Sequence, residues 1–280
     1  MNQSELEQLI QKFCPSLIDY VKSGKPKWKK VLQRYSKREG NIEIEKKTNG
    51  KAVVETCFFD LLQGAERGDH SCKSFLKEID SVVSELRGLV GVKNQDGLKK
   101  IIKGMLSSFD SEVMPRPNPA YLNSIGELAS LLVILKKSDF ELLQFEKKIQ
   151  NGKHIDFYLK NKITGFEIFI EVVNIHLDDT VPYDEISVGD VVEKKIDDKI
   201  KCTTKGISHL NDIERDLNFL AMVWCDLETL NDNRQFFEDF AEKYYKLLQP
   251  CIILQYRENL SNDYKYIFGT ITSILEKFSK

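Results

Sequence analysis

The sequence predicts an α/β protein in which a mixed β-sheet flanked by helices follows a mainly helical N-terminal domain. From residue 57 to about 109, the spacing of apolar residues is that of amphipathic helices. From residue 119, a long apolar helix is followed by three strand-like segments, a helix and a fully apolar strand. This order, α-β-β-β-α-β, predicts an antiparallel meander closed by a helical crossover, which forms an α/β sandwich around one mixed sheet.

Composition sets the broad class of the protein. The 280 residues are 41% hydrophobic and 30% charged, as in ordinary globular proteins, and they suffice for one large domain or two smaller ones. The formal net charge of −2 provides no global attraction to nucleic acid or membrane, so a polyanion must bind a local patch. No apolar run approaches the roughly 20 residues that span a bilayer.

Two further features indicate a cytoplasmic protein without a membrane anchor. The N-terminal stretch MNQSELEQLIQKF has the pattern of an acidic amphipathic helix and not of a signal peptide. The six cysteines are scattered and form no CxxC pair, which predicts reduced structural thiols and no zinc site.

The N-terminal region is expected to consist mostly of helices. Residues 1–37 predict two or three short helices, and the stretch IEIEKKTNGKAVVET predicts a β-hairpin that turns at Asn49-Gly50. The stretch SFLKEIDSVVSELRGLV predicts a helix that docks through one apolar stripe. That stripe consists of Phe75, Ile79, Val82, Val83, Leu86 and Val90.

The stretch MPRPNPAYLN predicts a domain boundary, because three prolines in five residues favour an extended connection. We therefore expect a helical domain over 1–113 and an α/β domain over 114–280. Asn118 and Pro119 have the features of an N-cap and a first helical residue. The helix that they begin runs to about Lys137, is apolar over most of its circumference and carries Glu127 in its middle.

The elements of the α/β domain follow from alternation and turn residues. Strands are expected over 140–147, 154–160 and 166–175, with turns at 151–152 and 161–165. A helix is then expected over 187–205. It is followed by the apolar strand LNFLAMVWCDL, an amphipathic helix over 232–248 and the strand CIILQYRE.

Two acids lie inside strands that are otherwise apolar. Asp156 and Glu171 are 15 positions apart across a short turn, so on antiparallel strands they can face each other. Two desolvated carboxylates at that distance repel each other and, unpaired, should bind a proton. A hard divalent ion such as Mg²⁺ or Mn²⁺ removes the conflict, because it accepts carboxylate, water and phosphate oxygens.

With these acids in this order of elements, the chain resembles the PD-(D/E)xK nuclease superfamily over about residues 118–228. The resemblance implies a restriction-endonuclease-like core, in which Asp156 within HIDF is the first acid and Glu171 within IEVV the second. Glu127 matches the glutamate that the first helix often supplies. By the same resemblance, Glu127, Asp156, Glu171 and the carbonyl of Val172 bind one or two metal ions.

One position departs from the pattern of the family. Two residues after the second acid the family has a lysine, and this chain has Val173. Some members supply the lysine from the following helix, and here Lys195 and Lys199 run beside its expected buried stripe of Val192, Ile196 and Ile200. Either lysine is a candidate catalytic residue, with Lys199 favoured; the alternative is that both are solvated residues of the helix surface.

A basic segment is the candidate for contact with nucleic acid. VKSGKPKWKKVLQRYSKR holds eight Lys or Arg and no acid, with Trp28 and Tyr35 interleaved. Clustered cations and aromatic platforms suit a phosphate backbone and unstacked bases, whereas a basic face with Trp28 in the core is the alternative. The candidate binding residues are Lys25, Lys27, Trp28, Lys29, Lys30 and Arg34. His154 and His176, beside the two acids, are minor candidates for a chemical role.

The leading hypothesis is therefore a metal-dependent nuclease that acts on DNA in preference to RNA, as an endonuclease, with homodimerisation left open. The absence of P-loop, GxGxxG and GxSxG patterns disfavours kinases, nicotinamide dehydrogenases and α/β-hydrolases. A second hypothesis is an inactive nuclease fold that binds nucleic acid or a protein partner, because Val173 replaces the lysine. A third is a structural scaffold in which Asp156 and Glu171 pair with Lys153, Lys194 or Lys195.

Overall fold

The computed structural model describes residues 2–22, 25–38, 53–113, 120–149, 151–177, 187–205, 217–243, 248–257 and 264–279. The chain divides into two compact units. We call them the helical unit (Met1–Arg87, Leu98–Ile125 and Arg257–Lys265) and the sheet unit (Gly88–Gly97, Gly126–Tyr256 and Tyr266–Lys280). The units are thus discontinuous in sequence, and the residues about the expected boundary, 114–119, lie outside the described part.

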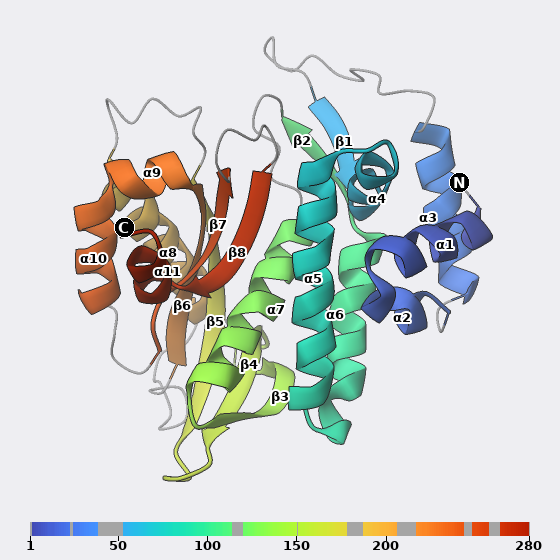
Figure 1. Ribbon diagram of the computed structural model, residues 1–280. Helices are drawn as coiled ribbons and strands as arrows, with labels where there is room; N and C mark the ends of the chain where they lie inside the picture. The colour runs from blue at the N-terminus through green and yellow to red at the C-terminus, as the bar shows by residue number, and fades with distance from the viewer. Residues whose placement is uncertain are drawn as a thin grey trace. The chain divides into compact units, whose positions relative to one another are not determined.

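The helical unit contains most of the helices expected before residue 110 (Figure 1). They are α1 (Gln3–Phe13), the 3-10 turn η1 (Pro15–Leu17), α2 (Ile18–Lys22), α3 (Lys25–Arg38), α4 (Phe58–Glu66), α5 (His70–Leu89) and α6 (Gln95–Ser107). All six residues of the expected stripe are buried, five of them on α5 and Val90 directly after its end, which confirms that this face of the helix is apolar and buried. The turn of the expected hairpin lies outside the described residues. Strand β1 (Val53–Cys57) pairs antiparallel with β2 (Phe109–Val113).

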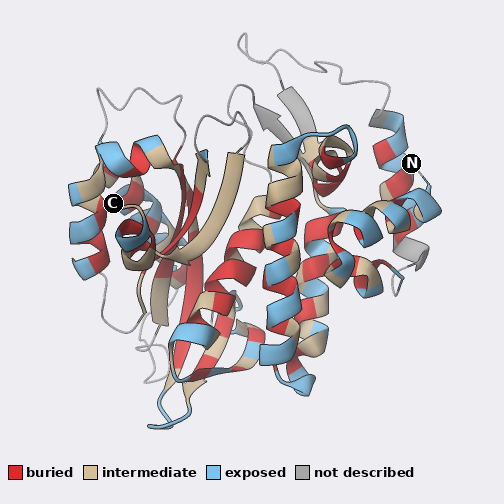
Figure 2. Cartoon of the chain, in the orientation of Figure 1, coloured by how far each residue is buried: buried red, intermediate tan, exposed pale blue. Residues whose placement is uncertain are grey.

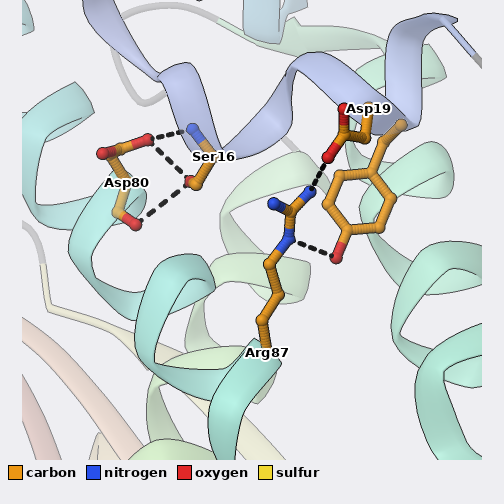
Figure 3. Close-up of polar contacts among 5 residues, drawn as sticks. Ser16, Asp19, Asp80 and Arg87 are labelled. Atoms are coloured by element: carbon orange, nitrogen blue, oxygen red, sulfur yellow. Dashed lines mark hydrogen bonds and ion pairs between the residues drawn. The ribbon is translucent and has the colours of Figure 1, made fainter. Parts of the chain in front are cut away.

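Polar contacts hold α5 against the N-terminal helices (Figure 3). The Asp80 carboxylate accepts hydrogen bonds from the Ser16 amide at 2.7 Å and the Ser16 hydroxyl at 2.6 Å. Two turns further along, Arg87 donates to the Tyr20 hydroxyl at 3.1 Å and lies over the Tyr20 ring. A hydrogen bond to a charged group is stronger than a neutral one, so Asp80 is an anchor of this unit.

We therefore expect Asp80→Ala to lower the free energy of unfolding by about 1–3 kcal/mol, because the Ser16 amide and hydroxyl lose a charged acceptor. Urea titration followed by circular dichroism measures the change. Lys77→Ala, at an exposed position of the same helix, is the matched control and should be neutral. Equal stability of the two variants would contradict the anchoring role of Asp80.

The sheet unit is built on a mixed sheet flanked by helices. Among the described residues six strands pair in the order β3-β4-β5-β6-β7-β8. The strands are β3 (Phe140–Lys148), β4 (His154–Asn161), β5 (Glu167–His176), β6 (Leu217–Asp226), β7 (Cys251–Arg257) and β8 (Tyr264–Thr270). Strands β3, β4 and β5 form an antiparallel meander, and β6 and β7 continue it in parallel to β5.

The helices of the sheet unit cover two faces of the sheet. One apolar core joins β5, β6 and β7 to α8 (Val188–Thr204), α9 (Leu227–Asp232), α10 (Arg234–Lys243) and α11 (Ile271–Lys277). On the other face, α7 (Ala120–Lys137) approaches the sheet at Gly126, where an added Cβ would lie 1.9 Å from the Asn174 Oδ1 atom. A side chain at position 126 is excluded, so glycine sets how near Glu127 lies to the strands. Figure 2 shows the buried residues along these elements.

Most of the elements expected in the α/β domain are confirmed, including α7, the three strands of the meander and the crossover helix α8, whose N-cap is Ser187. The helix expected over 232–248 is corrected. Asp226 accepts a hydrogen bond from the Thr229 amide and begins the short helix α9, and α10 starts at Arg234, after Asn233. In the described part of the chain, no helix is long and apolar enough to cross a bilayer.

Candidate active site at the fork between β4 and β5

Asp156 and Glu171 lie where β4 and β5 separate. The ladder between these strands ends at the pair Phe157 and Ile170, so the next two opposing positions are Asp156 and Glu171. There carboxylate oxygens replace backbone carbonyls as hydrogen-bond acceptors. The Val172 amide donates to Asp156 Oδ2 at 2.8 Å, and the Asp156 amide donates to Glu171 Oε2 at 3.3 Å. The two acids predicted to face each other therefore do so, at the fork of the sheet.

Lys199 provides the cation of this site. Its Nζ atom lies 2.8 Å from Glu171 Oε1, and the Glu171 side chain is only 7% exposed. Burial lowers the pKa of Lys199, but the hydrogen bond to Glu171 and the negative charges of Glu171, Asp156 and Glu127 outweigh it, so the pKa is raised overall. Lys199 is therefore protonated at neutral pH.

The structure also accounts for Val173. This residue is 4% exposed and belongs to the apolar core under α8, together with Val192 and Ile196. A lysine at position 173 would begin within that apolar core, where an unpaired ammonium is costly. The helix that covers Val173 carries Lys199, so the positive charge reaches Glu171 from α8 and not from β5.

The acids influence one another strongly. Burial and the negative charge of Glu171 raise the pKa of Asp156 to about 7, against the lowering effects of the Val172 amide and Lys199. Burial, followed by the charge of Asp156, raises the pKa of Glu127 on α7 well above its usual range. One lysine thus does not neutralise the cluster, and a further positive charge would stabilise the ionised carboxylates.

Glu146 is an acid of this neighbourhood that the sequence did not predict. Its negative charge contributes to the raised pKa values of both Asp156 and Glu127. The pairs Phe145–Phe157 and Lys147–Ile155 place it across from Asp156 on β3, at a point where its φ is +47°. A left-handed residue inside a strand is uncommon and, for a residue other than glycine, costs free energy.

The donor chemistry of the site fits a hard divalent ion, because its ligands are carboxylate oxygens with an excess of negative charge. As the side chains of the described residues lie, no three His, Cys, Asp or Glu groups are close enough together to hold one ion. Mg²⁺ typically takes only one or two carboxylates and keeps several waters, and Asp156 and Glu171 meet that requirement as neighbours.

The other candidates lie farther from the acids or have other partners. Lys195 is exposed. Burial, together with the positive charge of Lys195, lowers the pKa of His176 to about 4, so His176 is neutral at pH 7. The His176 ring stacks on Trp224. His154 is exposed at the start of β4. Lys153 donates to the Cys202 carbonyl near the end of α8, away from the acids.

Residues 25–38 of the basic segment form α3, and the aromatic residues of this helix point inward. Trp28 and Tyr35 are each 2% exposed, so their rings are not available as stacking platforms in this fold. Lys29 and Lys30 are exposed, and exposed Arg34 lies over the Phe109 ring. The side chains of Lys25 and Lys27 lie outside the described part. Of the predicted nucleic-acid interface, only the cations stay candidates. Trp28 lies in the core, as expected from the alternative in which α3 is a basic surface helix.

Comparison with known proteins adds no assignment. No protein-family model matches the chain, and neither a curated protein nor a solved structure matches it.

Proposed function

We propose that the protein is a metal-dependent nuclease with a restriction-endonuclease-like core, which hydrolyses phosphodiester bonds of DNA as an endonuclease. The observation that carries the proposal is the fork, where Asp156 and Glu171 face each other and Lys199 contacts Glu171. The order α7-β3-β4-β5-α8-β6, with its antiparallel meander and parallel crossover, supports it. The resemblance in Asp156, Glu171 and Glu127 described above points to the same class of chemistry.

The residues of the chain have separate roles in this proposal. Asp156 and Glu171 would hold Mg²⁺ or Mn²⁺. By the resemblance, the Val172 carbonyl would be a further ligand, and Glu127 would become one only with a change in the positions of the acidic side chains. The ion, when bound, would lower the pKa of a water and stabilise negative charge on the phosphate. Lys199 would place a protonated ammonium beside the same phosphate, where it stabilises charge that builds up during hydrolysis.

Cleavage of supercoiled plasmid tests the proposal directly. We expect nicked and then linear DNA in the presence of Mg²⁺ or Mn²⁺, and no cleavage with EDTA. Loss of cleavage in Glu171→Gln would exclude a contaminating nuclease. Absence of cleavage of both DNA and RNA by a wild-type protein that binds the metal would overturn the enzymatic proposal.

The second candidate is an inactive nuclease fold that binds nucleic acid or a protein partner. The ion pair between Lys199 and Glu171 favours it, because this pair partly neutralises the site without a metal. Calorimetric titration with Mn²⁺ separates the candidates from a structural scaffold, since only a metal site should show saturable heat. Metal binding without cleavage would favour the inactive fold.

The cations of α3 would contribute to DNA binding in either candidate. Reversal of Lys27, Lys29 and Lys30 to Glu is expected to weaken binding and to flatten its salt dependence by roughly one unit of slope for each lost phosphate contact. Fluorescence anisotropy with a labelled duplex measures the slope. The salt concentration is varied from about 50 to about 200 mM, the range over which phosphate contacts change affinity strongly. An unchanged slope would show that α3 is only a solvated basic face.

A further inference from the structure

The turn between β4 and β5, residues 161–166, is a rigid hairpin tip. Asn161 organises it: its side-chain Oδ1 atom accepts hydrogen bonds from the Ile163 and Thr164 amides, each at 2.9 Å. The Asn161 amide donates to the Phe166 carbonyl at 2.7 Å, and Gly165, at φ +74°, donates to the Asn161 carbonyl. These bonds order the backbone at the tip.

This tip exposes apolar side chains where polar residues are usual. Ile163 is 75% exposed and Phe166 39%, and both belong to the few large hydrophobic residues that are exposed in the described part of the chain. Figure 2 colours the tip of this hairpin, labelled by β4 and β5 in Figure 1, as exposed. Single exposed apolar residues are common, whereas this one ordered turn carries two of them.

Lysines flank the apolar tip. Lys160 precedes the turn, with its stem over Gly165, and Lys162 is exposed beside Ile163. The Lys162 amide donates to the carbonyl of Asp139, which joins the tip to the end of α7. The exposed charged residues of that adjoining segment are Lys136, Lys137, Asp139 and Glu141. Glu167, which follows Phe166, lies opposite Lys160 in the register of β4 and β5. Across the tip and this segment, four lysines thus stand against three acids.

We propose that this tip is a wedge for the minor groove of duplex DNA, with Ile163 against a base step and Lys160 and Lys162 on the flanking phosphates. The inference rests on the proposed nuclease function and assigns its substrate contact. Minor-groove proteins use this combination of an apolar wedge and neighbouring cations to partly unstack a base step. The lysines favour a polyanion over an apolar protein surface.

The length of the hairpin fixes where the wedge would act. Five residues separate Asp156 from Asn161, which at about 3.3 Å per residue is roughly 17 Å along β4. With a rise of about 3.4 Å per base pair, this distance corresponds to about five base pairs from the scissile phosphate. With the hairpin lying along the duplex, the wedge would contact DNA about half a helical turn from the cut. The narrow minor groove of B-form DNA would suit it better than the wide, shallow minor groove of RNA.

The experiment measures binding and base unstacking separately from cleavage. Wild-type protein, Ile163→Ala, Phe166→Ala and Lys162→Ala are titrated by anisotropy, with Ca²⁺ present, onto a duplex of about 24 base pairs, which is roughly two helical turns. Val92→Ala is the matched control, because Val92 is an apolar residue that is even more exposed than Ile163, at 92%, and lies on the 3-10 turn Val92–Asn94. Single 2-aminopurine substitutions along the duplex report the unstacked step.

We expect Ile163→Ala to weaken duplex binding about tenfold and to abolish the rise in 2-aminopurine fluorescence. Wild-type affinity and an unchanged fluorescence rise in Ile163→Ala would overturn the wedge, even if the protein cuts DNA. A wedge that depends on Ile163 in a protein that never cuts would stand, while the nuclease proposal would fail. A change in oligomeric state of Ile163→Ala by light scattering, without a change in DNA binding, would assign the tip to contact between copies and overturn the proposal.

Discussion

Asp156→Ala is expected to abolish both metal binding and cleavage. Asp156 lies opposite Glu171 at the end of the ladder, and the Val172 amide holds its carboxylate at 2.8 Å. Removal of this group leaves Glu171, which Lys199 already pairs, without its neighbouring acid. Calorimetric titration with Mn²⁺ should show no saturable heat, and plasmid cleavage should fall to background.

A matched control separates this effect from a general loss of acidic charge. Asp139→Ala removes an exposed acid of the same unit and should bind Mn²⁺ and cleave as the wild type does. A circular dichroism spectrum identical to that of the wild type would show that Asp156→Ala is folded. Undiminished Mn²⁺ heat in a folded Asp156→Ala protein would contradict the assignment of this acid as a ligand.

The raised pKa of Asp156 also predicts a pH dependence. Its folded pKa is about 7, above the unfolded value near 3.9, so between these limits the folded state binds more protons. The metal-free protein is therefore expected to lose stability as pH rises from about 4 to about 7, and Asp156→Asn should lose less. Thermal unfolding across this range with EDTA measures the difference. Metal affinity should change in the opposite direction and rise with pH, because the ion competes with the proton.

The sheet and its acidic pair could be predicted from sequence because their patterns are local. Alternation sets the face of each residue in β4 and β5, and the short turn sets the register, so Asp156 and Glu171 are opposite each other. Lys199 could be selected because it lies beside the apolar stripe of α8, which must face the sheet. In each case one element and its nearest neighbour contained the necessary information.

Other features depend on contacts or irregularities that a pattern does not contain. Glu146 lies near Asp156 at a point of β3 where Glu146 itself has a left-handed backbone conformation, and nothing in the stretch FELLQFEKK predicts that conformation. Strand β8 is an edge strand beside β7, and all its residues are partly exposed, so the alternation of apolar and polar residues along it is weak. The burial of Trp28, in contrast, could be predicted from the sequence. Its spacing of four from Leu32 and seven from Tyr35 is that of a buried helical stripe, and all three residues are buried.

Lys199→Met should reduce the rate of metal-dependent cleavage about a hundredfold, which corresponds to roughly 3 kcal/mol of transition-state stabilisation. Its ammonium is the cation in contact with Glu171 at 2.8 Å, whereas the Lys195 side chain is exposed one turn earlier on α8. Methionine keeps much of the apolar stem but removes the charge. Lys195→Met is therefore the matched control and should cut at the wild-type rate.

Single-turnover cleavage with saturating Mn²⁺ distinguishes a role in the reaction from a role in metal binding. If Lys199 stabilises charge on the phosphate, Lys199→Met lowers the rate constant while the dissociation constant for Mn²⁺ stays nearly unchanged. If the lysine serves only to neutralise Glu171, its removal leaves two acids for the metal alone, and saturating Mn²⁺ restores the wild-type rate. Wild-type rates in both variants would exclude the hypothesis that a lysine of α8 replaces the family lysine missing at position 173. A wild-type protein that binds Mn²⁺ and never cuts would instead identify the Lys199–Glu171 pair as a feature of an inactive nuclease fold.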